Sequence, residues 1–159
     1  MTALASMAWP LAAAWCFALT LVSAVFPWVN AEIIVLSLPT VARGTWALAG
    51  LVAVATMGQM AGKCIVFWTA RRGAQAPSPK IRAQLAKWQV RFDSHRWAPT
   101  LLVLWSSLTG LPPFYVTTML AGALRMNFPL FLAAGTVGRL VRFGSLVAGA
   151  AWLTGVATR

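Results

Sequence analysis

Long apolar stretches of this chain alternate with shorter apolar segments that prolines interrupt. A helix that crosses a bilayer needs about 20 mostly apolar residues. Three stretches have that length, namely residues 4–25, 46–70 and 128–156. Two further apolar segments, residues 26–42 and 97–125, are too short or too broken for a simple span. We therefore predict an all-α membrane protein with three transmembrane helices and two re-entrant helical hairpins, in one domain over residues 1–159.

The second hairpin is predicted from a break in the middle of its apolar segment. Pro112 and Pro113 follow Gly110 closely there. Each proline removes a backbone donor and clashes with the preceding turn, and glycine adds backbone freedom, so a straight helix is not expected to continue. Unpaired backbone at membrane depth must be covered by protein or line a water-filled cavity, and broken helices often form binding sites. The two prolines are therefore candidate site residues.

Between the second and third predicted spans, the pattern changes to that of an amphipathic helix. The apolar residues that recur at helical spacing are Ile81, Leu85, Trp88 and Phe92. Lysines and arginines occupy the other face, and Ser78 can cap the helix with Pro79 at its first position. We predict a helix over residues 79–94 that lies in the membrane interface, where its basic side chains reach anionic headgroups. Binding of a partner protein to the apolar face is the alternative.

Composition and charge fit a membrane protein better than a nucleic-acid-binding one. Of the 159 residues, 60% are hydrophobic and 9% are charged, against about 25% charged in a soluble domain. The net charge is +11, but 7 of the 13 basic residues lie between Arg71 and Arg96, beside apolar spans. Lysine and arginine gather on the cytoplasmic side of spans. We therefore predict that Arg71 to Pro99 is cytoplasmic, with a cytoplasmic amino terminus, an external carboxyl terminus and no nucleic-acid partner.

The sequence offers no pattern for a metal site or for catalysis. Cys16 and Cys64 lie in apolar stretches and match no metal or redox spacing, and His95 is the single histidine. A Ser-His-Asp hydrolase would have to use His95 with Asp93 in a basic loop, without a Gly-x-Ser-x-Gly motif. We therefore expect buried structural thiols, no cofactor and no enzymatic activity.

Ionisable residues within the apolar segments are the main candidates for a functional site, because a charge inside a membrane is costly. Glu32, in the first predicted hairpin, either faces the protein interior or lies at the interface beside Asn30. Lys63 directly follows the Gly-x-x-x-Gly motif Gly58 to Gly62, which predicts close packing against another helix. The Lys63 side chain is either buried or extends along the helix to the membrane surface.

The last span contains two arginines, Arg139 and Arg142. At 1.5 Å per residue, Arg139 lies roughly 16 Å from the start of the span, near the centre of the bilayer. We predict that Glu32 approaches Arg139, because two unpaired charges would incur two desolvation penalties. Arg142 would then remain to contact an anion. The two halves of the chain also contain similar pairs of residues in the same order. Phe26-Pro27 and Gly62-Lys63 in the first half correspond to Leu111-Pro112 and Gly138-Arg139 in the second, which indicates either inverted repeats or chance.

With these residues in view, the chain resembles the DedA superfamily, also called the VTT or SNARE-associated Golgi protein family. The likeness runs from about Phe26 to Phe143 and is nearest to a short branch with the Gly-Leu-Pro-Pro-Phe form. It rests on Phe26-Pro27 with Glu32, Gly58 and Gly62 with Arg71-Arg72-Gly73, the amphipathic helix, Gly110-Leu-Pro-Pro-Phe114, Ala121-Gly-Ala-Leu-Arg-Met126, and Gly138-Arg139 with Arg142-Phe143. The resemblance implies re-entrant hairpins that enter from opposite faces, and lipid movement across the membrane.

The chain departs from many members of that family at two places. Gln59 or Lys63 stands where many members have an acidic residue, and Trp105-Ser106 stands where many have an arginine. Proton coupling through a second carboxylate is therefore not implied for this chain.

The intramembrane charges motivate the functional prediction. Lys63, Arg139 and Arg142 supply three positive charges against the single negative charge of Glu32, and a phosphate would neutralise the surplus. We predict a multi-pass protein of the bacterial inner membrane that translocates or scrambles a polyprenyl phosphate or a phospholipid. The candidate lipid-binding residues are Glu32, Lys63, Pro112, Pro113, Arg125, Arg139 and Arg142.

Other interpretations of these charges remain open. Hairpin carbonyls would also stabilise the surplus charge, which would make the arginines structural, and a small-solute or ion transporter would use the same cavity. Lipids with anionic headgroups are the expected partners, and a homo-oligomer is left open.

Overall fold

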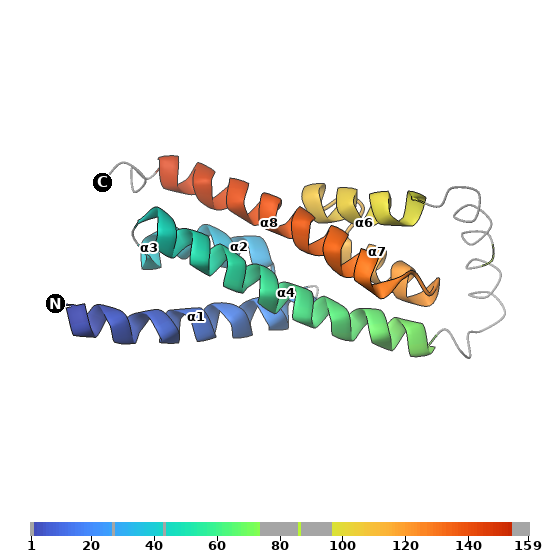
Figure 1. Cartoon of the computed structure of the whole chain (residues 1–159), viewed down its shortest axis with the longest axis horizontal. Coiled ribbons are helices and arrows are strands. Elements are labelled where there is room, and N and C mark those ends of the chain that lie inside the picture. Colours follow the sequence, from blue (N-terminus) through green and yellow to red (C-terminus); the bar gives the residue numbers. More distant parts are fainter. Residues whose placement is uncertain (1, 27, 43, 74–85, 87–96, 154–159) are drawn as a thin grey trace. The chain divides into compact units, whose positions relative to one another are not determined.

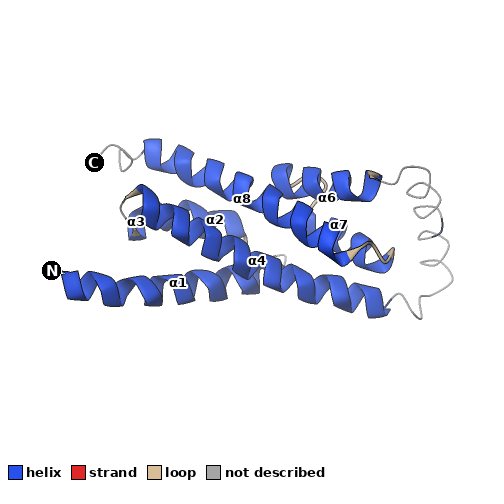
Figure 2. Cartoon of the chain, viewed as in Figure 1, coloured by secondary structure: helices blue, strands red, loops and turns tan. Residues whose placement is uncertain are grey.

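The computed structural model describes residues 2–26, 28–42, 44–73, 86 and 97–153. Within these residues all regular secondary structure is helical and no strand occurs, which confirms the all-α prediction for this part of the chain (Figure 2). The helices are α1 (Thr2–Val25), α2 (Ala31–Leu36), α3 (Leu38–Val41), α4 (Thr45–Gly73), α6 (Ala98–Thr109), α7 (Phe114–Ala123) and α8 (Phe128–Leu153) (Figure 1). The predicted amphipathic helix over residues 79–94 lies outside the described residues.

Two helices, α4 and α8, are long and apolar enough to cross a membrane. They contain 29 and 26 residues, which at 1.5 Å per residue exceeds the roughly 30 Å thickness of a hydrocarbon core. They correspond to the predicted spans 46–70 and 128–156, although residues 154–156 are outside the described part. The first predicted span, residues 4–25, lies within helix α1, in which the segment Trp9–Val25 is apolar. That span stays a prediction.

The chain divides into two compact units. Residues 1–62 and 140–159 make up one, here called the terminal unit, and residues 63–139 make up the other, the central unit. Helices α4 and α8 each contribute residues to both units. Each candidate contact below is therefore described within its own unit.

In the terminal unit the chain turns back after α1, so that α3 lies toward the amino-terminal end of α1 (Figure 1). Asn30 caps α2, because its side-chain oxygen accepts a hydrogen bond of 2.9 Å from the Glu32 backbone N–H. Hairpin one was predicted within residues 26–42. In this range the structure has α2 and α3, ten residues together, which form a short returning arm after α1, and the re-entrant hairpin stays a prediction.

Helices α1, α2, α3, α4 and α8 share the hydrophobic core of the terminal unit. Its fully buried members include Val35 of α2, Leu51 and Ala55 of α4, and Phe143 of α8. Side chains from the other four helices thus share one core with α2, which is too short to be stable alone.

The Gly-x-x-x-Gly motif of α4 packs against α1. A Cβ atom added at Gly58 would lie 2.5 Å from the Phe17 carbonyl oxygen, and one at Gly62 would lie 2.7 Å from the Leu21 carbonyl oxygen. Only glycine therefore lets the two backbones approach this closely. The close packing predicted for this motif is confirmed, and its partner is α1.

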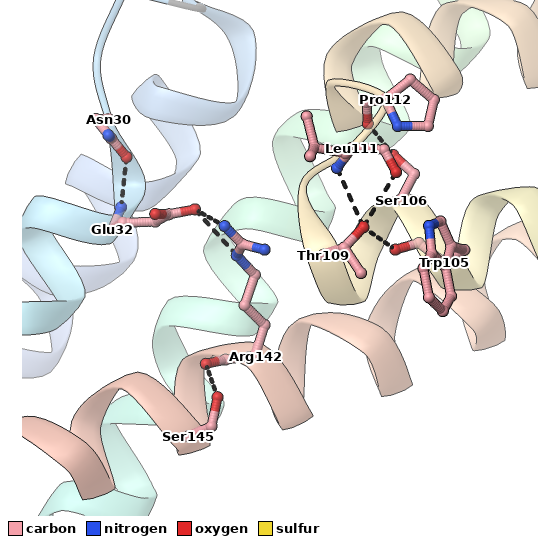
Figure 3. Close-up of polar contacts among 9 residues, drawn as sticks. All are labelled: Asn30, Glu32, Trp105, Ser106, Thr109, Leu111, Pro112, Arg142 and Ser145. Carbon is pink, nitrogen blue, oxygen red and sulfur yellow. Dashed lines mark hydrogen bonds and ion pairs between the residues drawn. The ribbon is translucent and has the colours of Figure 1, made fainter.

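In the central unit, α6 and α7 form a helical hairpin around the predicted break. Gly110 ends α6 with a left-handed φ of 79°, and Pro113 directly precedes α7. The hydroxyl of Ser106 donates a 2.6 Å hydrogen bond to the Pro112 carbonyl oxygen (Figure 3). The hydroxyl of Thr117 on α7 donates a 3.0 Å bond to the Ser106 oxygen. Buried hydroxyl groups thus satisfy backbone that the prolines leave without helical partners.

Two glycines set the packing of the hairpin against α4 and α8. A Cβ atom at Gly122 of α7 would lie 2.3 Å from the Phe67 carbonyl oxygen of α4. A Cβ atom at Gly138 of α8 would lie 1.8 Å from the Ser107 hydroxyl oxygen of α6. Close helix contacts at glycines therefore occur in both units. Gly62 of the terminal unit directly precedes Lys63, and Gly138 of the central unit directly precedes Arg139.

Candidate functional site

Two buried cations of the central unit lie on one aromatic ring. Lys63 is 4% exposed and Arg139 is 7% exposed. The Lys63 Nζ atom lies 5.8 Å from the centre of the Phe114 ring, and the Arg139 guanidinium carbon lies 4.7 Å from the same ring centre. Lys63 Nζ is also 4.9 Å from the ring centre of Tyr115. We call Lys63 and Arg139 the buried cation pair.

The proline break and Gly138 position this pair. Phe114 is the first residue of α7, directly after Pro113, and it is buried. Gly138 allows α8 to approach α6 closely, and Arg139 is the next residue. Of the two alternatives for Lys63, the buried one is therefore found, and its ammonium group does not extend to the surface.

The electrostatics of the pair favour a negatively charged group beside it. The face of an aromatic ring attracts each cation by about 0.5–2 kcal/mol, but the two positive charges repel each other. An anion in contact with both cations would reduce the repulsion and the cost of burying them.

The second charged contact, in the terminal unit, joins Glu32 to Arg142. The Arg142 Nε group donates a 3.0 Å hydrogen bond to Glu32 Oε1, and Nη2 donates to the same oxygen (Figure 3). The side chains of Arg142 and Glu32 are 18% and 34% exposed. Glu32 is therefore a member of an ion pair, and it also lies beside Asn30, whose side-chain oxygen accepts from the Glu32 N–H.

The partner predicted for Glu32 requires a correction. Because of its estimated depth in the membrane, Arg139 was predicted to contact Glu32, and Arg142 was predicted to contact a ligand. In the structure the ion pair of Glu32 is with Arg142. The prediction that Arg142 is left over is therefore wrong. On α8, it is Arg142 that reaches Glu32 of α2, whereas Arg139 packs on the Phe114 ring of α7.

The remaining candidate residues lie at the two ends of α7. Pro112 and Pro113 precede Phe114, so they are next to the ring that receives the cations. Arg125 follows the other end of α7, roughly 15 Å from Phe114 along the helix axis. Arg125 is therefore not part of the buried cation pair. No role in the site was predicted for Phe114 or Tyr115 from the sequence. Their position directly after the proline break, in a chain with cations in its apolar segments, could have indicated that they contact those cations.

The structure offers no metal site in the part of the chain that it describes. No three His, Cys, Asp or Glu side chains lie together among those residues. Cys16 is a buried free thiol whose sulfur lies 3.8 Å from the Leu51 carbonyl oxygen, and Cys64 is a half-buried free thiol. The prediction of a buried structural thiol is thus confirmed for Cys16.

Comparisons with known proteins add no family to this description. No model of a protein family, no curated protein and no solved structure matches the chain.

Proposed function

We propose that this chain is a multi-pass protein of the bacterial inner membrane that binds the anionic headgroup of a lipid at Lys63 and Arg139 and helps the lipid to cross the bilayer. The observation that carries the proposal is the burial of both cations on the Phe114 ring. A phosphate group has the charge and the acceptor oxygens to contact an ammonium and a guanidinium group together. Polyprenyl phosphates and phospholipids both carry such a group.

A membrane location is supported by the surfaces of the two long helices. On α8, the valines at 137 and 141 are 54% and 55% exposed, and on α4, Met57 and Ile65 are similarly open. Large exposed apolar surfaces mark sites of membrane or protein interaction. We propose that α1, α4 and α8 span the membrane and that the hairpin of α6 and α7 is re-entrant, with its broken backbone covered by protein.

Membership of the DedA superfamily is part of the same proposal. Two of the motifs that carry the resemblance also build the candidate site. Gly110-Leu-Pro-Pro-Phe114 makes the break and supplies the ring, and Gly138-Arg139 brings an arginine to that ring. These local roles support a common mechanism of lipid movement, with an anion held at the break.

The test is a lipid flip assay in proteoliposomes, with labelled lipids of anionic and of zwitterionic headgroup. Lys63→Met and Arg139→Met each remove one charge and keep an apolar stem of similar length. Arg72→Gln is the matched control, because it removes a charge from the exposed end of α4. We expect the two buried-site variants to slow movement of the anionic lipid about tenfold or more, since a charge-assisted hydrogen bond is worth about 1.5–3 kcal/mol.

The outcomes separate this proposal from its alternatives. Wild-type rates in both buried-site variants would contradict it and favour structural cations. Movement of a labelled soluble anion without movement of any lipid would favour the transporter instead. Folding of each variant is checked by its thermal unfolding midpoint in detergent.

A further inference from the structure

A second arginine site lies at the other end of α7, where the carboxyl-terminal end of α4 meets the connection between α7 and α8. The Arg71 guanidinium carbon lies 5.2 Å from the centre of the Trp68 ring, and Arg71 Nη1 donates a 3.5 Å hydrogen bond to the Met126 carbonyl oxygen. The Trp68 ring in turn lies 5.6 Å from the Phe128 ring. Arg71 therefore contacts this connection through Met126 and packs on Trp68 of its own helix.

Arg125, the neighbour of Met126, occupies a backbone position that favours glycine. The Met126 N–H donates to the Ala121 carbonyl oxygen and the Arg125 N–H donates to the Gly122 carbonyl oxygen, both at 3.0 Å. These two bonds are the Schellman pattern of a helix end. Arg125 is the left-handed residue of the pattern, with φ of 55°, where glycine or asparagine is usual. A side chain with a Cβ atom is disfavoured there.

We propose that Arg71 and Arg125 form a binding site for the headgroup of an anionic glycerophospholipid that stays attached to the protein. The Arg71 guanidinium reaches the backbone of the residue next to Arg125, so both cations belong to one end of the central unit. Arginine matches phosphate oxygens in a bidentate manner. Basic sites between transmembrane helices near the cytoplasmic surface bind lipid headgroups in this way.

Trp68 favours a position of this site at the headgroup level of the membrane, and a lipid rather than a free phosphate as its ligand. Trp68 is 43% exposed and its ring packs beside Arg71, and tryptophan favours the headgroup level of a membrane. The lipid phosphate would contact the two guanidinium groups, and the first part of an acyl chain would lie along the exposed face of the ring. A free phosphate would use the arginines but gain nothing from Trp68.

This site is independent of the transport proposal. It shares no residue with the buried cation pair, and Arg125 lies the length of α7 from Phe114. The site therefore holds a structural lipid in this interpretation, whether or not another lipid moves past Lys63 and Arg139. Failure of one proposal leaves the other standing.

The experiment measures lipid retention by native mass spectrometry on the full chain in detergent after delipidation. Phosphatidylglycerol and, separately, phosphatidylcholine are titrated onto the wild type, Arg125→Gly, Arg71→Gln and the control Arg43→Gln. We expect each of the two site variants to bind phosphatidylglycerol about fivefold more weakly, the contribution of one arginine near an anionic surface. Binding of phosphatidylcholine should not change, and Arg43→Gln should resemble the wild type.

Arg125→Gly keeps the test free from a folding artefact. Glycine adopts a positive φ without strain, so the thermal unfolding midpoint of this delipidated variant should equal or exceed that of the wild type. Wild-type retention of phosphatidylglycerol by Arg125→Gly would overturn the proposal, as would an equal loss in Arg43→Gln. Displacement of phosphatidylglycerol by inorganic phosphate would also overturn it, because that result would indicate a site for a soluble anion.

Discussion

Arg142 on α8 donates two hydrogen bonds to one carboxylate oxygen of Glu32 on α2, the first from Nε at 3.0 Å. The two residues are 110 positions apart in the chain. The contact therefore ties the short returning arm, which has little helical stability of its own, to a long helix of the terminal unit. Within this unit the ion pair acts as a clamp, that is, a contact that holds α2 against α8.

Charge reversal should test that clamp. Glu32→Arg or Arg142→Glu alone places like charges together, and we expect each to lower the free energy of unfolding by about 2 kcal/mol, between the values for exposed and buried pairs. The double swap should recover more than half of the combined loss. Unfolding of the detergent-solubilised protein by heat or by a denaturing detergent measures this, and strictly additive losses would argue against the pair.

Substitution of Gly122 should be far more harmful than substitution of Gly144. A Cβ at Gly122 would lie 2.3 Å from the Phe67 carbonyl oxygen, a backbone atom that cannot rotate away, whereas nothing lies within 4 Å of one at Gly144. We expect Gly122→Ala to reduce stability by about 1–3 kcal/mol through overpacking. Gly144→Ala should be neutral or should stabilise α8 by about 0.5–1 kcal/mol. Equal unfolding midpoints for the two variants would show that the close contact at Gly122 is absent.

The hydroxyl network at the proline break should contribute to stability. Ser106 is fully buried, donates to the Pro112 carbonyl oxygen and accepts from Thr117. Ser106→Ala removes both bonds and takes the Ser106 acceptor from the buried Thr117 hydroxyl, so we expect a loss of about 1–3 kcal/mol. Thr117→Val leaves the bond to Pro112 intact and should lose about 0.5–1.5 kcal/mol.

A threonine outside this network provides the control for those two variants. The Thr69 hydroxyl is exposed and bonds only within its own helix, to the Ile65 carbonyl oxygen. Thr69→Val should therefore change the free energy of unfolding by less than about 0.5 kcal/mol. A Ser106→Ala variant as stable as Thr69→Val would contradict the role given to the network.

The charge pattern predicts the orientation of the chain in the membrane. With Cys16 and Cys64 replaced by alanine, a cysteine at position 78 should resist a membrane-impermeant maleimide in intact spheroplasts and react after lysis. A cysteine at position 158 should react in both conditions, since the carboxyl terminus is predicted to be external. Ready labelling of position 78 before lysis would reverse the orientation.

Much of the local structure was predictable from the sequence, because its causes are local. Apolar stretches of sufficient length give α4 and α8, and the missing donors of Pro112 and Pro113 end α6 near Gly110. The Gly-x-x-x-Gly motif of α4 also predicted a close helix contact. Each of these features depends on residues within a few turns of one another, so a linear pattern contains the information.

The partners of the charges depended on the tertiary structure. Arg139 and Arg142 are three residues apart on one helix, and the sequence places both among apolar residues where a charge needs a partner. Packing decided that Arg142 meets Glu32 while Arg139 and Lys63 meet Phe114. Helical spacing fixes the direction and height of a side chain on its own helix, but the neighbour it meets is set by which distant segment packs there.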